Sequence, residues 1–293
     1  MHLVTFSESN VIRIGILDDS LTKIIDVSRI YPACPPDMNS LVEQEDEHIN
    51  KLKSLVSTVP SHFDLQQVKL LAPIPNPKRN ILCIGKNYRD HVNEVQATIS
   101  NRNGEIPKVP IFFTKATTSV IGSGESIPVS GDFTASADYE GELGLIISKG
   151  GKQIKREDAM SHVFAYTIIN DVTSRRLQKS HQQWFLGKSL DGFCPMGPSL
   201  LTKDSVKDVI QLEIKTYVNG KLRQQGQVSE MIFDIPCLIE QLSKSMTLIP
   251  GDIIATGTPA GVGMGFKPPK FLQPGDHVSV KIDPIGCLEN ICC

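Results

Sequence analysis

Residues 138–147 read Asp-Tyr-Glu-Gly-Glu-Leu-Gly-Leu-Ile-Ile, a polar start followed by an apolar run. Because successive side chains of a β-strand point to opposite faces, a strand here places Glu140 and Glu142 on one face, about 7 Å apart at ~3.3 Å per residue. Two carboxylates this close repel each other unless a positive group lies between them. Taken alone, the motif is more typical of two solvated glutamates on an exposed strand.

A second segment supplies a third acid. Residues 163–169 form a nearly continuous apolar run, typical of a strand covered on both faces, and Asn170 and Asp171 follow it. An acid at the end of a buried strand needs a partner. Three carboxylates with no histidine or thiol nearby in sequence suit Mg²⁺, Mn²⁺ or Ca²⁺ better than zinc. The spacing leaves open whether the two segments meet.

The flanking sequence favours an α+β fold that is predominantly β. Three prolines within residues 71–77 indicate a linker, so we expect a small β-containing N-terminal domain at 1–70 and a catalytic domain at 71–293. In the first domain we expect an antiparallel meander, then one or two surface helices in 39–70. The other expected strands are 81–85, 110–115, 139–148, 163–171, 212–218, 252–256 and 277–282, and the expected helices are 156–162, 173–182 and 234–245.

Composition excludes several classes of function. The formal net charge of the 293-residue chain is -2 with no dense basic run, so we expect neither a nucleic-acid nor a membrane-binding face. There is no secretory signal and no apolar stretch long enough to span a bilayer. Seven scattered cysteines indicate reduced thiols and a cytoplasmic protein, with mitochondria as the alternative. Cys292 and Cys293 are expected in a frayed C-terminus.

Other polar residues are candidates for catalysis or binding. In a helix over 89–94, His91 and Glu94 share a face, an arrangement that suits a general base, although an ordinary surface pair is the more common case. A loop at 95–109 would let this segment move as a lid. Lys188 lies in an aromatic, apolar setting, where it either stabilises a developing carbanion or extends to solvent. Arg175 and Gln178 share a helix face that either contacts a carboxylate or is solvated. The glycine- and threonine-rich segment 256–263 either binds an anion or forms a turn without a ligand.

Five motifs follow one another along the chain. They are Gly-Lys-Asn-Tyr-Arg-Asp-His-x-x-Glu at 85–94, Glu-Gly-Glu at 140–142, Asn-Asp-Val-Thr at 170–173, Gly-Lys-Ser at 187–189 and Thr-Gly-Thr-Pro-x-Gly-Val-Gly at 256–263. In this order they make the chain resemble the fumarylacetoacetate hydrolase superfamily over about residues 71–285. Leu-Ala-Pro at 71–73 and Lys-Pro-Pro at 267–269 make it look most like the branch called fumarylacetoacetate hydrolase domain-containing protein 2. One departure is Lys86, where relatives often carry arginine, leucine or methionine.

The resemblance implies a mixed β-roll catalytic domain, a homodimer and a small 2-oxo acid as substrate. It implies that Mg²⁺ or Mn²⁺, with Ca²⁺ as a structural substitute, is bound by the three acids. His91 with Glu94 would activate water or move a proton, and Lys188 would stabilise an enolate. Metal ligands would be Glu140, Glu142 and Asp171, and substrate contacts would be Lys86, Tyr88, Arg175, Gln178, Gly257 and Thr258.

Three functions remain open from the sequence. The first is hydrolysis of the C–C bond of acylpyruvate-like β-diketo acids through a metal-bound enolate. The second is decarboxylation or keto–enol tautomerisation of oxaloacetate, which needs the same site. The third is a catalytically silent or pathway-specialised biosynthetic relative, disfavoured because every candidate catalytic residue is present.

Overall fold

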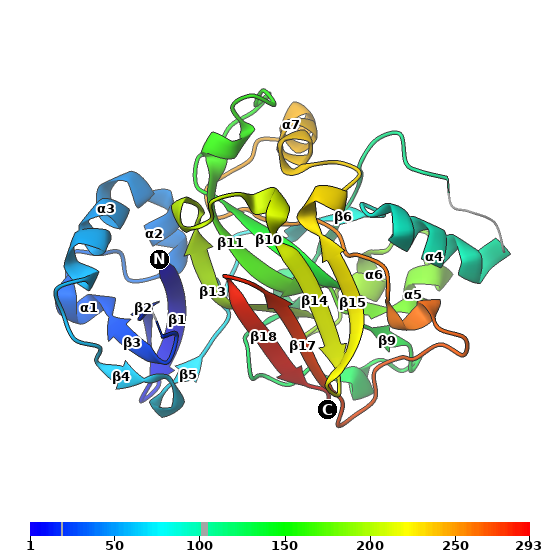
Figure 1. The fold of residues 1–293 in the computed structure, drawn as a ribbon, viewed down its shortest axis with the longest axis horizontal. Helices are drawn as coiled ribbons and strands as arrows, with labels where there is room; N and C mark the ends of the chain where they lie inside the picture. The colour runs from blue at the N-terminus through cyan, green and yellow to red at the C-terminus, as the bar shows by residue number, and fades with distance from the viewer. Residues whose placement is uncertain (19, 101–104) are drawn as a thin grey trace.

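The computed structural model describes residues 1–18, 20–100 and 105–293 and is dominated by β-structure (Figure 1). The strands are β1 (His2–Glu8), β2 (Val11–Leu17), β3 (Lys23–Asp26), β4 (Phe63–Asp64), β5 (Lys69–Leu70), β6 (Ile81–Gly85), β7 (Ile111–Lys115), β8 (Val120–Ile121), β9 (Ala137–Asp138), β10 (Gly141–Ile147), β11 (Val163–Asn170), β12 (Thr173–Ser174), β13 (Cys194–Thr202), β14 (Glu213–Val218), β15 (Lys221–Gln227), β16 (Ile253–Ala255), β17 (His277–Ile282) and β18 (Gly286–Ile291).

The α-helices are short and peripheral. They are α1 (Val27–Ile30), α2 (Met38–Glu43), α3 (Glu45–Val56), α4 (Arg89–Ser100), α5 (Arg175–Ser180), α6 (Phe185–Lys188) and α7 (Ile235–Ser245). Asp234 caps α7 by accepting a hydrogen bond from the Cys237 N–H, and Pro236 stands in its first turn, where no helical N–H is needed. In the described parts of the chain, no helix is long and apolar enough to cross a bilayer.

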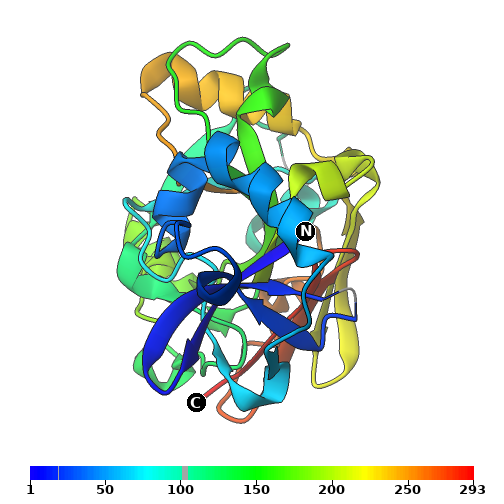
Figure 2. The same cartoon turned by 90° about the vertical axis from the view of Figure 1, so that its left-hand side faces the viewer.

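A large mixed sheet organises the chain. Among the described residues it contains twelve strands, ten of them in the order β4-β3-β2-β1-β13-β11-β10-β16-β6-β7, while β5 pairs with β1 and β8 pairs with β13. The N-terminal strands join it because His2 and Leu3 of β1 pair with Leu201 and Leu200 of β13. In Figure 2 this N-terminal part, with its helices, faces the viewer. The domain boundary at residue 70 stays a prediction.

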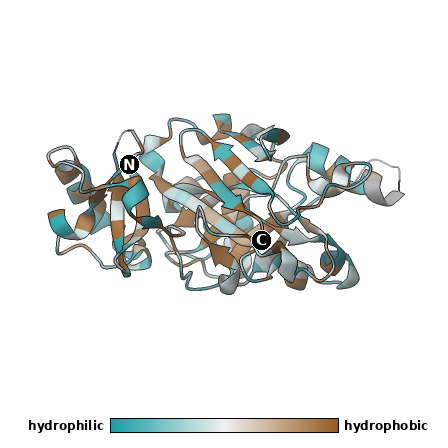
Figure 3. Ribbon diagram, turned by 90° about the horizontal axis from the view of Figure 1, so that it is seen from below, coloured by the Kyte–Doolittle hydropathy of each residue, from teal (hydrophilic) through white to brown (hydrophobic). Residues whose placement is uncertain are grey.

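A second sheet, in the order β15-β14-β17-β18, packs against the large one. Every residue of β10 and β11 is buried, and their apolar side chains alternate between two clusters. Leu143 and Leu145 belong to the cluster that includes the second sheet and α7, whereas Ile146 belongs to the cluster under α2 and α3. Gly141 permits the close approach of the sheets, since a Cβ there would lie 2.2 Å from Thr216 Oγ1. Hydrophobic residues accordingly gather in the strands (Figure 3).

Several expected elements differ in extent. The helices of 39–70 end at Val56, and two short strands follow; only a 3₁₀ turn, Ala159–His162, forms within 156–162. The strands β13, β15 and β18 were not expected, because Pro and Gly interrupt the apolar pattern of β13, Gly and Gln that of β15, and Glu and Asn that of β18. Of the expected loop 95–109, residues up to Ser100 continue α4, and 101–104 lie outside the described residues.

The C-terminus is not frayed, and that expectation was wrong. β18 pairs along its length with β17. Cys292 is buried, and its N–H donates to Asp276 O. The Cys293 N–H donates to Ile127 O at 2.9 Å. These backbone hydrogen bonds hold the last residues against the rest of the chain. Apolar periodicity in the sequence does not indicate such backbone contacts.

Candidate metal and substrate site

The three predicted acids converge at the adjacent ends of two strands. Glu140 precedes β10 and Asp171 follows β11, and these strands pair antiparallel with Gly141 opposite Asn170. Glu140, Glu142 and Asp171 are 5%, 1% and 0% exposed, and each offers an oxygen within 4.8 Å of the others. The interpretation of the glutamates as solvated side chains is therefore excluded.

Three cationic side chains surround this acid cluster. Lys188 Nζ donates to Glu140 Oε2 at 2.7 Å and to Asp171 Oδ2 at 2.6 Å. Lys115 Nζ donates to the other oxygen of Asp171, Oδ1, at 2.7 Å. Arg175 Nη1 lies 2.6 Å from Glu140 Oε1. Lys188 is 2% exposed, so it does not extend to solvent.

The electrostatics of the cluster are uneven. Burial opposes ionisation of Glu140, but the charges of Lys188, Arg175 and His91 outweigh it and hold the pKa of Glu140 well below its usual range. Burial, followed by the charges of Asp171 and Glu140, raises the pKa of Glu142 well above its usual range. Glu142 is thus the acid that most lacks a positive partner, as expected where a cation can bind.

The donor set fits a hard divalent ion. All three groups offer carboxylate oxygen, and no thiol or imidazole belongs to the cluster. Glu142 is held for such a role by the Gly257 N–H, which donates to its Oε2 at 2.8 Å. The cluster can therefore hold a divalent metal ion.

Asp138 connects the acid cluster to the glycine-rich loop. Its buried carboxylate accepts from Arg175 Nε at 2.8 Å and from the Gly263 and Met264 N–H groups at 2.6 and 3.0 Å. Arg175 is thereby fixed between Asp138 and Glu140, while its Nη2 is buried without a hydrogen-bond partner in the described parts of the chain. A buried guanidinium N–H with no partner is suited to an anionic ligand.

His91 and Glu94 lie on one face of α4, as predicted, but their contact is long. His91 Nδ1 and Glu94 Oε2 are 3.4 Å apart. Both carboxylate oxygens of Glu94 instead accept the Gly261 N–H, at 3.0 and 3.1 Å. Glu94 therefore joins α4 to the glycine-rich loop, and His91 faces the cavity.

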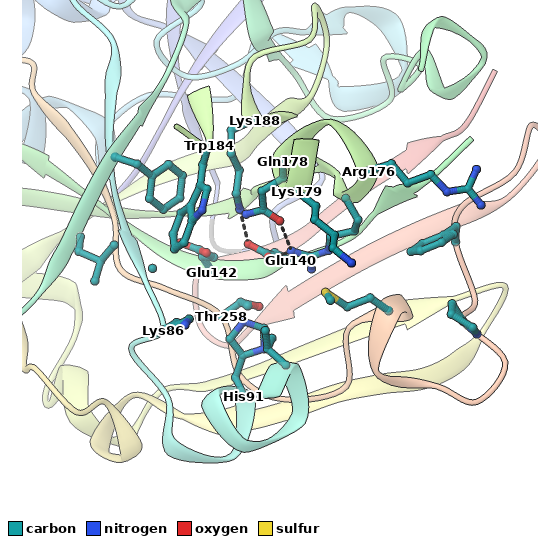
Figure 4. A pocket seen from close by; sticks show the side chains of 18 residues that line it. Lys86, His91, Glu140, Glu142, Arg176, Gln178, Lys179, Trp184, Lys188 and Thr258 are labelled. Atoms are coloured by element: carbon teal, nitrogen blue, oxygen red, sulfur yellow. Dashed lines mark hydrogen bonds and ion pairs between the residues drawn. The ribbon is translucent and has the colours of Figure 1, made fainter. Parts of the chain in front are cut away.

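A cavity of about 480 Å³ opens beside the acids (Figure 4). Lys188 lies over Glu140, with His91 on the opposite side of the cavity (Figure 4). Trp184 forms one wall, and its ring packs edge to face against the ring of Phe113, with the ring centroids 5.4 Å apart. The lining comprises Ile84, Gly85, Lys86, His91, Val95, Phe113, Glu140, Glu142, Arg175, Arg176, Gln178, Lys179, Trp184, Lys188, Thr258, Met264, Pro269 and Phe271.

The predicted substrate contacts fall into two groups. Lys86, Arg175, Gln178 and Thr258 line the cavity. Gly257, at φ +100, is instead behind Glu142 and donates its N–H to it.

Tyr88 does not line the cavity. It packs in the core, and its buried hydroxyl has no hydrogen-bond partner in the described parts of the chain. A contact of this side chain with substrate stays a prediction.

Sequence reasoning missed two buried residues of the site and part of the cavity wall. Lys115 ends an apolar strand, where an unexpected lysine was the available signal. Asp138 is the first residue of the segment 138–147, but it lies outside the alternating pattern of that segment. Met264 and Phe271 come from a segment with no periodicity, and no sequence signal places them.

The comparisons with known proteins agree with this geometry. The model of the fumarylacetoacetate (FAA) hydrolase C-terminal domain matches residues 80–292. The chain belongs to the fumarylacetoacetate hydrolase family. Family members are enzymes acting on small molecules, and this chain is an enzyme of the same fold; the predicted branch within the family stays a prediction.

Three relatives illustrate the range of the family. Oxaloacetate tautomerase YisK of Bacillus subtilis (strain 168) is 55% identical over 228 residues, 78% of this chain and 74% of that protein. The structure of a fumarylacetoacetate hydrolase from psychrophilic Exiguobacterium antarcticum is 40% identical with a TM-score of 0.85, covering 100% of this chain and 99% of that one. A maleylpyruvate hydrolase from Sphingobium sp. SYK-6, solved with manganese (II) ion and pyruvate, is 28% identical with a TM-score of 0.79, covering 100% and 98%.

Proposed function

We propose that this enzyme catalyses the keto–enol tautomerisation of oxaloacetate or a similar 2-oxo diacid, with Mg²⁺ or Mn²⁺ at Glu140, Glu142 and Asp171. The observation that carries the proposal is that two of these acids, Glu140 and Glu142, face one cavity together with a buried lysine and an imidazole. The 55% identity to an oxaloacetate tautomerase supports tautomerisation over the other reactions of the family.

Tautomerisation moves one proton from C3 of the substrate to the oxygen on C2, or the reverse. A divalent ion at the acids would supply electrophilic polarisation of the C2 carbonyl. His91, which is 6% exposed and lines the cavity, would take or return the proton at C3. The ammonium of Lys188 stabilises negative charge that develops on the C2 oxygen.

Substrate recognition would use the basic side chains of the cavity. The unpartnered Nη2 of Arg175 and the amide of Gln178 suit the carboxylate next to the 2-oxo group. Lys86, Arg176 and Lys179 also line the cavity, Arg176 and Lys179 as exposed residues at its mouth. Their charges favour a second carboxylate at the far end of the substrate.

Hydrolysis of acylpyruvates is the second candidate. The proximity of His91 to Glu94 favours it, because a small shift of either side chain would shorten the 3.4 Å contact and complete a water-activating pair. The two solved relatives are named as hydrolases, which supports the same possibility.

One experiment separates these reactions. Purified enzyme with Mg²⁺ is given enol-oxaloacetate or acetylpyruvate, the enol absorbance is followed, and products are identified by NMR, each with and without EDTA. We expect metal-dependent acceleration of enol–keto relaxation without pyruvate or CO₂. Pyruvate and acetate from acetylpyruvate would establish hydrolysis, pyruvate and CO₂ from oxaloacetate would establish decarboxylation, and no metal-dependent change with either compound would reject the proposal.

We further propose a cytoplasmic homodimer. The seven cysteines are unpaired in the structure, as in a reducing compartment. The dimer rests on the family resemblance, and light scattering of the eluting protein tests it: a mass near 32.2 kDa would mean a monomer.

A further inference from the structure

Each acid of the candidate metal site has one oxygen engaged by a protein donor other than Lys188. The three donors come from separate elements, so they hold the carboxylates in fixed orientations. They are Arg175 Nη1 on Glu140 Oε1 at 2.6 Å, the Gly257 N–H on Glu142 Oε2 at 2.8 Å, and Lys115 Nζ on Asp171 Oδ1 at 2.7 Å. Each acid is left with its second oxygen for a shared cation.

Lys115 is the least replaceable of these donors. It is 0% exposed, and its ammonium also donates to Val172 O at 3.0 Å and to Lys188 O. Its three N–H groups thus have three acceptors, which is the full capacity of an ammonium. Lys115 does not line the cavity, so it cannot contact the substrate.

Lys188 differs in this respect. Its ammonium donates to Glu140 Oε2 and Asp171 Oδ2, the oxygens that the fixed donors leave over. A divalent ion that binds these oxygens competes with Lys188 but not with Lys115. Lys188 would therefore be the lysine that a bound ion displaces, whereas the contact of Lys115 with Asp171 Oδ1 would persist.

We propose that Lys115 is a positioning residue that makes Asp171 a one-oxygen ligand and so makes the site select Mg²⁺ over Ca²⁺. Mg²⁺ takes six ligands at about 2.0–2.1 Å in a strict octahedron, whereas Ca²⁺ takes 6–8 and favours carboxylates that bind through both oxygens. Three single oxygens leave three octahedral positions, enough for a 2-oxo acid and a water molecule. The inference rests on the metal dependence proposed above.

The test is the ratio of the Ca²⁺ and Mg²⁺ dissociation constants, measured by calorimetry and by the fluorescence of Trp184, the single tryptophan, which lines the cavity. Removing a positive charge strengthens binding of both ions, so the ratio isolates the geometric effect. In Lys115→Met, Asp171 Oδ1 is released and Ca²⁺ gains a second oxygen. We expect the ratio Kd(Ca²⁺)/Kd(Mg²⁺) to fall about tenfold, or about 1.4 kcal/mol.

Lys188→Met is the matched control. It removes the same charge from the same carboxylate but frees an oxygen that metal would use anyway, so both affinities should rise together with an unchanged ratio. Circular dichroism checks the fold of both variants. An unchanged ratio in folded Lys115→Met, or an equal change in Lys188→Met, would overturn the assignment.

The wild-type enzyme gives a second measurement that does not depend on a variant folding. It must bind Mg²⁺ at least as tightly as Ca²⁺, and a clear preference for Ca²⁺ would also overturn the assignment. Neither measurement uses turnover. A shifted ratio in an enzyme that lacks tautomerase activity would reject the proposed reaction and leave the role of Lys115 standing.

Discussion

Replacing Glu142 with glutamine should stabilise the metal-free protein and at the same time abolish its response to Mg²⁺. Two unit charges 4.8 Å apart interact by about 3 kcal/mol at an effective dielectric constant of ~20. Glu142 has two acidic neighbours, and burial together with their charges raises its pKa. Glutamine keeps an oxygen to accept the Gly257 N–H while removing the charge.

Uptake of a proton by Glu142 in the wild type limits the gain, so we expect about 1–2 kcal/mol without metal. At ~2–4 °C per kcal/mol for a large domain, the melting temperature of Glu142→Gln in EDTA should rise by roughly 2–8 °C. Wild-type protein at a Mg²⁺ concentration of a hundred times Kd should gain about 2.7 kcal/mol, and the variant almost nothing. Adding metal should therefore reverse the order of stability.

Thermal unfolding with EDTA and with MgCl₂, together with calorimetric titration of Mg²⁺, measures both effects. Glu157→Gln is the control, because its side chain is 75% exposed and should change stability by less than about 0.5 kcal/mol. A lower melting temperature of Glu142→Gln in EDTA would refute the repulsion argument. Undiminished Mg²⁺ affinity would mean that these three acids are not the metal site.

Three further predictions concern catalysis and acid stability. His91→Ala should lose at least about a hundredfold in turnover while its Mg²⁺ affinity is unchanged, and turnover at the wild-type rate would remove His91 from the reaction. Lys179→Ala should raise KM for oxaloacetate with little effect on kcat, because Lys179 lines the cavity. Lys155→Ala is the control, since its side chain is exposed and it should change neither constant. Equal effects of the two substitutions on KM would argue against a contact of Lys179 with the second carboxylate of the substrate. Burial lowers the pKa of His2 from 6.5 to about 4, so between these pH values the folded state binds fewer protons than the unfolded state. The contribution of His2 to the free energy of unfolding is therefore fully present above pH 6.5 and is lost as the pH falls toward 4. In urea titrations at pH 7 and 4.5, His2→Gln should lose about 1–2 kcal/mol less than wild type on acidification, and an identical loss would show that His2 is not the group responsible.

The sequence by itself determined the strands that carry the acids. The alternation in residues 138–147 and the apolar run of 163–169 reflect burial on both faces of the sheet, which is a local constraint on residue type. The sequence also indicated His91 and Glu94 as candidate catalytic residues through their helical spacing, and Lys188 through its apolar surroundings. Each of these signals depends on residues close together in the chain, and the ordered motifs indicated the family before any geometry.

Only the tertiary structure decided how these pieces combine. Pairing of β10 with β11 brings Asp171 to the glutamates, and the sequence separation of about thirty residues carries no information on that register. Lys115, 56 residues from Asp171, completes the site through a contact that no local pattern encodes. The length of the His91–Glu94 contact and the engagement of Glu94 by Gly261 likewise depend on how α4 meets a loop 167 residues further along. Periodicity reports which side of an element is buried, whereas contacts between distant elements arise from packing, and packing decides which charges meet in the buried site.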